Sequence, residues 1–130
     1  MSYLPCVEVE PATEARSSVI WLHGLGANGH DFESMATELK LPNALATRFI
    51  FPHSPSIPVT VNCGKVMPAW YDILEMSFER KINLEHLNSS SDAVHALIDR
   101  EVERGVTPNR IVLAGFSQGG AVAYQAAFNL

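Results

Sequence analysis

Hydrophobic and polar positions alternate with two different periods along the chain, and the first period predicts strands. Segments rich in apolar residues occur at 18–22, 47–51 and 111–114. Runs of this kind, bounded by Gly or Pro, are typical of strands buried on both faces of a parallel sheet. Residues 3–10 instead alternate apolar and polar side chains, which predicts an edge strand whose pairing is limited on one side by Pro5.

The second period, with apolar residues three and four positions apart, predicts helices between these strands. One is expected to start at a cap formed by Asp31, and a second at the Ser-rich segment 89–92, ending before Gly105. The Ala-rich run at 120–127 predicts a third. Strands that alternate with helices in this order indicate an α/β fold, a mostly parallel sheet with flanking helices.

Residues 52–90 fit neither period, because four prolines interrupt the segment. Residues 62–64 are expected to form a turn between two short extended pieces. The aromatic and apolar side chains of Met67, Trp70 and Tyr71 argue against disorder. A long irregular excursion that is not disordered usually has a functional role in a compact domain.

The strand at 111–114 runs into Gly115-Phe116-Ser117-Gln118-Gly119 and then into a helix. Gly-x-Ser-x-Gly between a strand and a helix is the nucleophile-elbow pattern, in which a strained turn lifts the serine hydroxyl clear of its surroundings. The same letters also occur in ordinary turns before helices, but the flanking strand and helix favour Ser117 as a nucleophile.

A second glycine pattern, Gly-x-Gly-x-x-Gly at 24–29, also lies between a strand and a helix. A dinucleotide site would need an acidic residue after the next strand, and residues 49–53 hold none. A phosphate-binding P-loop would need Lys and Ser or Thr where His30 and Asp31 stand. The remaining interpretations are a plain Gly-rich connection or an oxyanion hole made by the backbone N–H groups of Leu25 and Gln118.

Composition narrows the classes of function. The 130 residues suffice for one globular domain or part of one, with a net charge of −5 and no cluster of Lys and Arg that would suit nucleic acid. No apolar run is long enough to cross a membrane. Cys6 and Cys63 have neither a zinc-binding spacing nor a secretory signal beside them, so we expect reduced thiols in a cytoplasmic protein.

Four sequence blocks together resemble the bacterial carboxylesterases related to acyl-protein thioesterases and lysophospholipases. They are HGLGANGHDF from His23, PHSP from Pro52 with the nearby PVT, MPAWYD from Met67 and GFSQGG from Gly115. The resemblance implies an α/β-hydrolase, a serine hydrolase of carboxylic esters or thioesters without a cofactor. It also implies Ser117 as nucleophile and an oxyanion hole from Leu25 and Gln118. Met67, Trp70 and Ile57 would line the acyl groove, although core packing accounts for these three side chains equally well.

One departure from the family pattern concerns the catalytic acid and base. An α/β-hydrolase places Asp or Glu and then His after the nucleophile, and residues 118–130 contain none of the three. We therefore expect residues 1–130 to be the N-terminal part of a single hydrolase domain, nearly inactive alone, with an unpaired and aggregation-prone edge at strand 111–114. The alternatives are a non-catalytic fragment or interaction module, or a lysophospholipase-type hydrolase.

The histidines and Asp72 offer no obvious replacement for the missing groups. His53 follows the strand at 47–51 without an acid placed to orient it. His23 is expected to make loop hydrogen bonds, and Asp72 to have a structural role. The remaining histidines are expected to be solvated or to cap helices: His30, His86 and His95.

Overall fold

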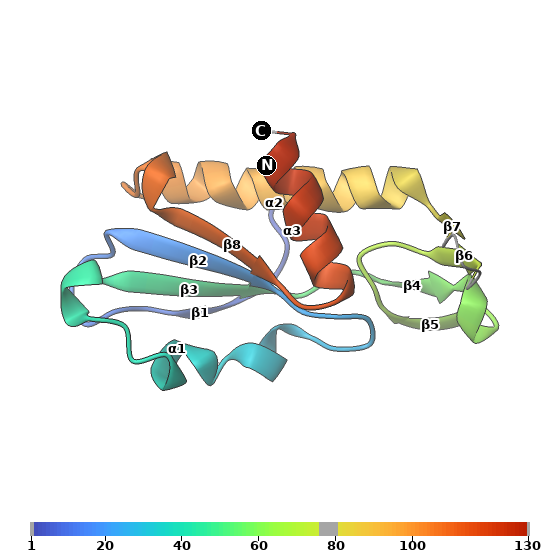
Figure 1. Ribbon diagram of the computed structural model, residues 1–130, viewed down its shortest axis with the longest axis horizontal. Coiled ribbons are helices and arrows are strands. Elements are labelled where there is room, and N and C mark those ends of the chain that lie inside the picture. The colour runs from blue at the N-terminus through green and yellow to red at the C-terminus, as the bar shows by residue number, and fades with distance from the viewer. Residues whose placement is uncertain (1, 76–80, 130) are drawn as a thin grey trace.

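The computed structural model describes residues 2–75 and 81–129 and contains a four-stranded sheet with helices on both faces (Figure 1). The strand order is β1-β3-β2-β8, with β1 antiparallel to β3 and the other pairs parallel. The strands are β1 (Cys6–Val9), β2 (Ser17–Leu22), β3 (Thr47–Pro52) and β8 (Ile111–Gly115). The expected α/β class and the edge strand near the N-terminus are confirmed.

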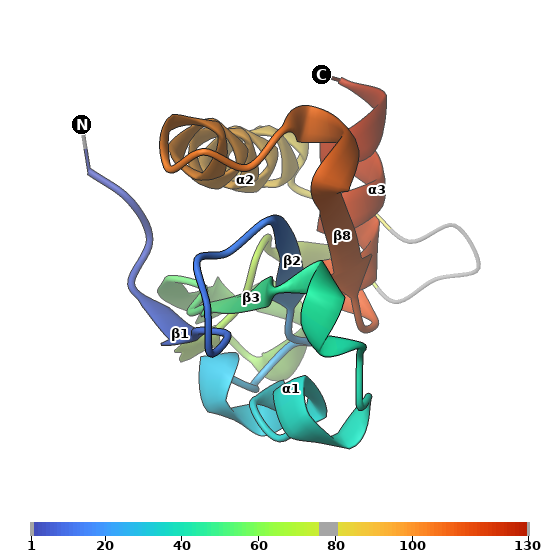
Figure 2. The same ribbon diagram turned by 90° about the vertical axis from the view of Figure 1, so that its left-hand side faces the viewer.

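The main core lies between the sheet and two helices, α2 (Leu84–Glu103) and α3 (Gln118–Phe128). Figure 2 shows both helices on one side of the sheet and the short α1 (Met35–Glu38) on the other. Ile20 of the central β2 is fully buried against Val94 and Val122 in one apolar cluster. The continuous apolar run of β2 therefore reflects cover from helices on both faces.

The segment after β2 differs from the expected single helix. It forms a 3₁₀ turn, η1 (Gly29–Phe32), followed by the four-residue α1. Asn28, and not Asp31, caps the first turn, because its side-chain oxygen accepts the N–H of His30 at 2.8 Å. A second short 3₁₀ turn, η2 (Asn43–Leu45), leads into β3. The carboxamide of Asn28 thus starts the turn earlier than the apolar spacing alone indicates.

Helix α2 ends as expected but begins earlier. Asn83 caps it by accepting the N–H of His86 at 3.0 Å, so the Ser-rich segment lies inside the helix. One of those serines, Ser90, turns inward and donates its hydroxyl to the carbonyl of Trp70. After the helix Gly105 adopts a φ of +102°, which explains why the helix stops there.

The excursion folds as two small antiparallel pairs beyond the carboxyl ends of β2 and β8 (Figure 1). The expected turn at 62–64 is confirmed, because Cys63 and Gly64 have φ of +57° and +74° between β4 and β5. Asp72 ties this hairpin down by accepting the N–H and the hydroxyl of Thr60, at 2.7 and 2.6 Å. The elements are β4 (Ser56–Val59), η3 (Thr60–Asn62), β5 (Lys65–Pro68), β6 (Ile73–Glu75) and β7 (Lys81–Ile82).

Strand β8 lies at an edge of the sheet formed by the described residues, as expected. Val112 of β8 is 56% exposed, and the neighbouring α3 exposes Tyr124 and Phe128. Aggregation through this edge stays a prediction. Both cysteines are free, and no helix in the described part of the chain has the length and apolar character needed to cross a membrane.

An ionic network lies at the end of the sheet where β2 and β3 begin, opposite the end that carries the excursion. Its centre is Glu101 of α2, which is fully buried. One carboxylate oxygen accepts the hydroxyl of Ser18 at 2.6 Å and the guanidinium of Arg48 at 2.7 Å. The other accepts from Arg104 at 3.0 Å, and Arg104 also binds Glu8 of β1. The network therefore joins α2 to three strands.

Candidate active site

Ser117 occupies the corner between β8 and α3 in a backbone conformation that a residue with a side chain rarely adopts. Its φ is +56° and its ψ is −118°, and the side chain is exposed. A Cβ at Gly115 would lie 2.4 Å from the carbonyl oxygen of Gly119, and a Cβ at Gly119 would lie 2.4 Å from the carbonyl oxygens of Leu22 and His23. Both glycines are therefore required by close backbone approach, and the corner has the geometry of a nucleophile elbow.

The glycine loop after β2 lies directly beside this corner. A Cβ at Gly24 would be 3.5 Å from the Cβ of Ser117. Gly26, with φ of +78°, donates its N–H to the carbonyl of Pro68 at 2.8 Å, which joins the loop to the excursion. Leu25 directly follows Gly24, and Gln118 directly follows Ser117. The backbone of both residues therefore lies next to the corner.

The side chain of Gln118 is buried, at 4% exposure, and holds the backbone of the excursion. Its Oε1 accepts the N–H of Trp70 at 2.7 Å, and its Nε2 donates to the carbonyl of Tyr71 at 2.8 Å. The sequence predicted a role only for the backbone of Gln118. A glutamine in the first turn of a helix gives no signal in sequence that its amide will pair with residues 48 and 47 positions away.

His23 is buried in the same region and uses both ring nitrogens. Its Nε2 accepts the N–H of Ser54 at 3.0 Å, so the proton lies on Nδ1, which donates to the carbonyl of Gly24 at 2.7 Å. Burial lowers the pKa of His23, which keeps the ring neutral. The expected loop hydrogen bonds are confirmed, and the ring has no nitrogen left to act as a base for Ser117.

The other histidines also serve local structure. His53 accepts the N–H of Gly29 on Nδ1 at 3.0 Å, and no carboxylate in the described part of the chain hydrogen-bonds to its ring. His30 is exposed and contacts Glu33 at 2.9 Å, as expected for a solvated residue.

The ring of His86 is not solvated and caps no helix, whereas the ring of His95 caps the last turn of a helix other than its own. His86 accepts the N–H of Asp72 at 3.0 Å, and His95 of α2 binds the carbonyl of Ala126 of α3 at 2.8 Å. Both rings join elements that are distant in sequence, which local sequence pattern does not encode.

Asp72 behaves as a structural acid. Burial raises the pKa of its carboxyl, but the hydrogen bonds from Thr60 outweigh burial, so the pKa lies below its ordinary value. Both carboxylate oxygens are engaged with Thr60. Asp72 thus fixes the excursion, and its hydrogen bond to the ring of His86 comes from its backbone N–H and not from its carboxylate.

The three residues expected to line the acyl groove lie in two different environments. Ile57 and Met67 face each other across the β4–β5 hairpin and are half-buried. Trp70 is 1% exposed and donates its indole N–H to the carbonyl of His23 at 2.8 Å. The indole belongs to the core cluster and also contacts the glycine loop beside Ser117.

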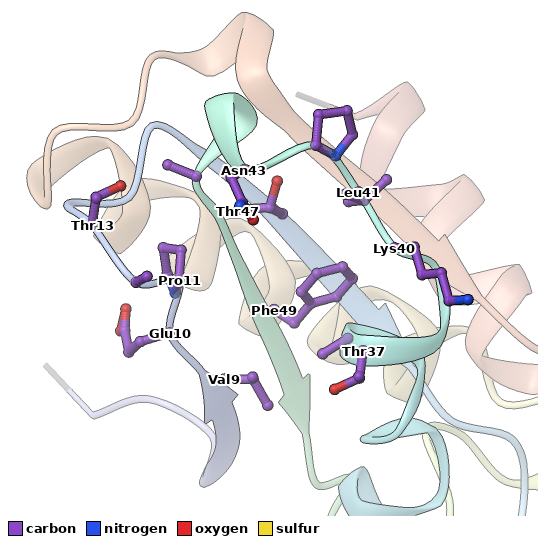
Figure 3. Close-up of a pocket in the computed structure, with 14 residues that line it drawn as sticks. Val9, Glu10, Pro11, Thr13, Thr37, Lys40, Leu41, Asn43, Thr47 and Phe49 are labelled. Carbon is purple, nitrogen blue, oxygen red and sulfur yellow. The ribbon is translucent and has the colours of Figure 1, made fainter.

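One depression in the surface lies away from this corner (Figure 3). It has a volume of about 500 Å³ and is bounded by the end of β1, the beginning of β3 and the segment after α1. Val9, Lys40 and Phe49 are among its lining residues. Because β3 and β8 run in the same direction, the beginning of β3 and the end of β8 mark opposite ends of the sheet. The depression therefore does not serve Ser117.

The described residues contain no cluster of three His, Cys, Asp or Glu side chains suited to a metal ion. What the corner itself offers is an exposed serine hydroxyl, the backbone of Gln118 next to it and the glycine loop beside it. This set of groups suits nucleophilic attack on a carbonyl carbon followed by stabilisation of an oxyanion.

Comparison with known proteins gives a consistent result. The sequence model of the phospholipase/carboxylesterase family matches residues 5–130. Acyl-protein thioesterase 1 of Gibberella zeae is 39% identical over 118 residues, which are 86% of this chain and 50% of that protein. Acyl-protein thioesterase 1 of Schizosaccharomyces pombe is 40% identical over 123 residues, 95% of this chain and 54% of that protein. The chain thus spans about half the length of these relatives.

Solved structures agree with the sequence matches. The crystal structure of Zea mays acyl-protein thioesterase 2 superposes with a TM-score of 0.79 at 30% identity, covering 96% of this chain and 51% of that one. Arabidopsis thaliana SOBER1 gives a TM-score of 0.80 at 35% identity, covering 86% and 54%. These structures support an α/β-hydrolase arrangement for the chain.

Proposed function

Since the chain belongs to the phospholipase/carboxylesterase family, we propose that Ser117 is the nucleophile of a serine hydrolase acting on carboxylic esters or thioesters. The observation that carries the proposal is the strained backbone of Ser117, with φ of +56°, between two glycines whose neighbours leave no room for a Cβ. Strain of this kind persists where the surrounding structure enforces it, and it is typical of functional corners. The narrower expectation of a bacterial member stays a prediction.

In the proposed reaction, the Oγ of Ser117 attacks the acyl carbonyl carbon and its proton passes to a base. The tetrahedral oxyanion accepts hydrogen bonds from the N–H groups of Leu25 and Gln118, each contributing on the order of 3 kcal/mol to the transition state. The C–O or C–S bond then breaks, and the alcohol or thiol leaves with a proton. Water attacks the acyl-serine, releases the carboxylic acid and restores Ser117. No step needs a cofactor.

The base and its orienting acid are the groups that the described corner lacks. His23 has both ring nitrogens engaged, and residues 118–130 contain no Asp, Glu or His. We infer that the 130 residues alone turn over esters far more slowly than a chain as long as the relatives. In a well-studied serine protease, loss of the base costs about a million-fold in kcat.

The names of the relatives and the residues near the corner both support one class of substrate. Three of the matched relatives are named acyl-protein thioesterase or probable carboxylesterase. We propose an acylated substrate with an apolar acyl chain, received by side chains of the excursion that include Met67, Ile57 and Trp70. A lysophospholipid is the alternative ester. The proposed setting is the cytoplasm.

The test is fluorophosphonate labelling together with hydrolysis of a p-nitrophenyl ester and an acyl thioester. It uses the chain alone and the chain joined to the C-terminal half of the S. pombe relative. We expect label on the Ser117 peptide of the joined protein, loss of label and turnover in Ser117→Ala, and normal behaviour in Ser56→Ala, an exposed serine of the hairpin. Normal turnover by Ser117→Ala would show that the assignment is wrong.

A second candidate is an interaction module without catalysis. The exposed apolar residues Val112, Tyr124 and Phe128 at and beside the open β8 edge favour it. Size-exclusion chromatography with light scattering and a thermal melt test this candidate. A soluble monomer with a cooperative melt supports an independent module, whereas an aggregated or unfolded chain argues for a part of a larger domain.

A further inference from the structure

The amide of Gln118 pairs with two successive residues of the excursion, in the manner of a neighbouring strand. Its oxygen accepts a hydrogen bond from the N–H of Trp70, and its nitrogen donates one to the carbonyl of Tyr71. Trp70 and Tyr71 lie between β5 and β6, outside any ladder of the small sheets. The side chain therefore supplies hydrogen bonds that secondary structure does not provide there.

The same short segment is tied to the glycine loop by independent bonds. The indole N–H of Trp70 binds the carbonyl of His23, and the carbonyl of Pro68 accepts the N–H of Gly26. Gln118 adds the connection that comes from the elbow itself, because it directly follows Ser117. Hydrogen bonds thus connect the elbow to the excursion, and the excursion to the glycine loop.

We propose that the side chain of Gln118 is a positioning residue that sets the distance between the Trp70 segment and Ser117. It does so through the two bonds to the backbone of Trp70 and Tyr71. The importance of this distance for an acyl group rests on the function proposed above, whereas the clamp itself does not. The side chain holds the excursion in place and keeps residue 118, a proposed oxyanion donor, in a fixed orientation.

The alternative is that Gln118 merely fills space in the core. Space filling would be served equally by Met, which has nearly the length of Gln but neither the amide donor nor the amide acceptor. The clamp requires both ends of the amide. The two roles therefore separate when the shape is kept and the hydrogen bonds are removed.

The experiment follows Trp70 itself in a Trp21→Phe background, where it is the only tryptophan of the chain. This background is suitable because the indole N–H of Trp21 is buried with no hydrogen-bond partner among the described residues, and the ring stacks on Phe32. The test variants are Gln118→Met and Gln118→Glu. Gln125→Met is the matched control on the same helix, where the glutamine makes one exposed bond to Asn88.

Gln118→Met is expected to speed exchange of the Trp70 amide hydrogen by about tenfold, the order expected for loss of a net hydrogen bond. The emission of Trp70 should shift to longer wavelength, while Gln125→Met changes neither signal. Unchanged exchange and emission in a folded Gln118→Met chain would overturn the proposal. Neither readout needs hydrolysis, so an inactive Ser117 and an absent clamp give distinguishable results.

Gln118→Glu decides the case even where Gln118→Met fails to fold. At about pH 8 the carboxylate cannot donate to Tyr71, whereas at about pH 5 a buried carboxyl regains its proton and can make both bonds. The emission difference between this variant and its parent should therefore disappear at the lower pH. The parent carries the same neighbouring titratable groups, His23, Asp72 and His86, so they cancel in the difference. A difference that persists at both pH values would contradict the clamp.

Discussion

The two ends of the sheet are held by different kinds of interaction. Where β2 and β3 begin, the buried carboxylate of Glu101 binds Arg48 and Arg104. Where β2 and β8 end, the elbow is held by the amide of Gln118, the indole of Trp70 and the ring of His23, all uncharged. The first end depends on charge and the second on backbone shape and neutral hydrogen bonds.

This difference shows how the molecule separates stability from chemistry. A fixed carboxylate like that of Glu101 close to the proposed nucleophile would oppose the negative charge that develops during acyl transfer. The ionic network lies at the other end of β2, since Ser18 begins this strand and Leu22 ends it against Gly119. Electrostatic attachment of α2 to the sheet can therefore be altered without direct contact with the elbow.

The largest effect is expected from Glu101→Ala at the ionic end. The change leaves Arg48 and Arg104 without their buried carboxylate and Ser18 without its acceptor. Removal of one partner of a buried ion pair typically costs about 3 kcal/mol or more in the free energy of unfolding. Urea unfolding measures this cost, and Glu103→Ala, at an exposed position on the same helix, is the control and should stay within about 0.5 kcal/mol.

At the neutral end, the second largest effect is expected from a substitution that adds a methyl group to the elbow instead of removing a charge. Gly119→Ala places a methyl group against the carbonyl oxygens of Leu22 and His23, so we expect a loss of about 2 kcal/mol in unfolding free energy. Gly120→Ala is the control, because its Cβ would meet the carbonyl oxygen of Gly115 only at 3.2 Å. Equal stability of the two variants in urea would contradict the close approach between elbow and β2.

Each end of the sheet also has a carboxyl group whose pKa is lowered in the folded protein, Glu8 at the ionic end and Asp72 in the excursion. Burial raises the pKa of Glu8, but the hydrogen bond and charge of Arg104 outweigh burial, so its folded-state pKa is below the ordinary value. The pKa of Asp72 is also depressed, through Thr60. Each carboxylate therefore stabilises the fold above its unfolded pKa of about 4, and this contribution is lost as pH falls through the lower folded value.

We expect Glu8→Gln to cost less than about 1 kcal/mol near pH 7 and this cost to shrink in about 1 M NaCl, because salt screens a partly exposed ion pair. The cost of Asp72→Asn should change less with salt, since the hydrogen bonds to its carboxylate come from the uncharged Thr60. Urea unfolding of both variants at low and high salt is the measurement. If salt changed the cost of Asp72→Asn more than the cost of Glu8→Gln, the distinction between the two ends would be wrong.

The smallest effect on stability is expected along the side edge of the sheet. Val112 is 56% exposed on β8, so Val112→Lys should change the unfolding free energy by no more than about 0.5 kcal/mol. A charge on an exposed edge opposes pairing with another strand. Light scattering should therefore show less self-association than in the parent chain, and unchanged self-association would exclude the β8 edge as its cause.

Much of the fold could be predicted from the sequence where a local pattern and a packing environment agree. The apolar run at 18–22 became β2 with one added residue, because helices cover both faces of this strand. The glycines at 115 and 119 indicated the elbow correctly, since a turn with such close backbone contacts requires glycine at fixed positions. The turn at 62–64 was predictable for the same reason.

Features that depend on distant partners could not be predicted. The start of α2 was missed because Asn83 caps it ahead of a Ser-rich segment that resembles a helix start, while Ser90 is held inside by Trp70. Glu101 and Ser18 are 83 positions apart, and the amide of Gln118 meets Trp70 across 48. Polar residues of this kind look like surface positions until the fold brings their partners to them.

The contact of residue 119 with the end of β2 also limits how the corner can be redesigned. A library that randomises residues around Ser117 would retain glycine at 115 and 119, because any side chain meets backbone atoms there. Phe116 is 60% exposed and can vary without entering the core. Residue 116 is therefore the position next to the serine that a library can usefully vary. Further positions to vary would come from the excursion.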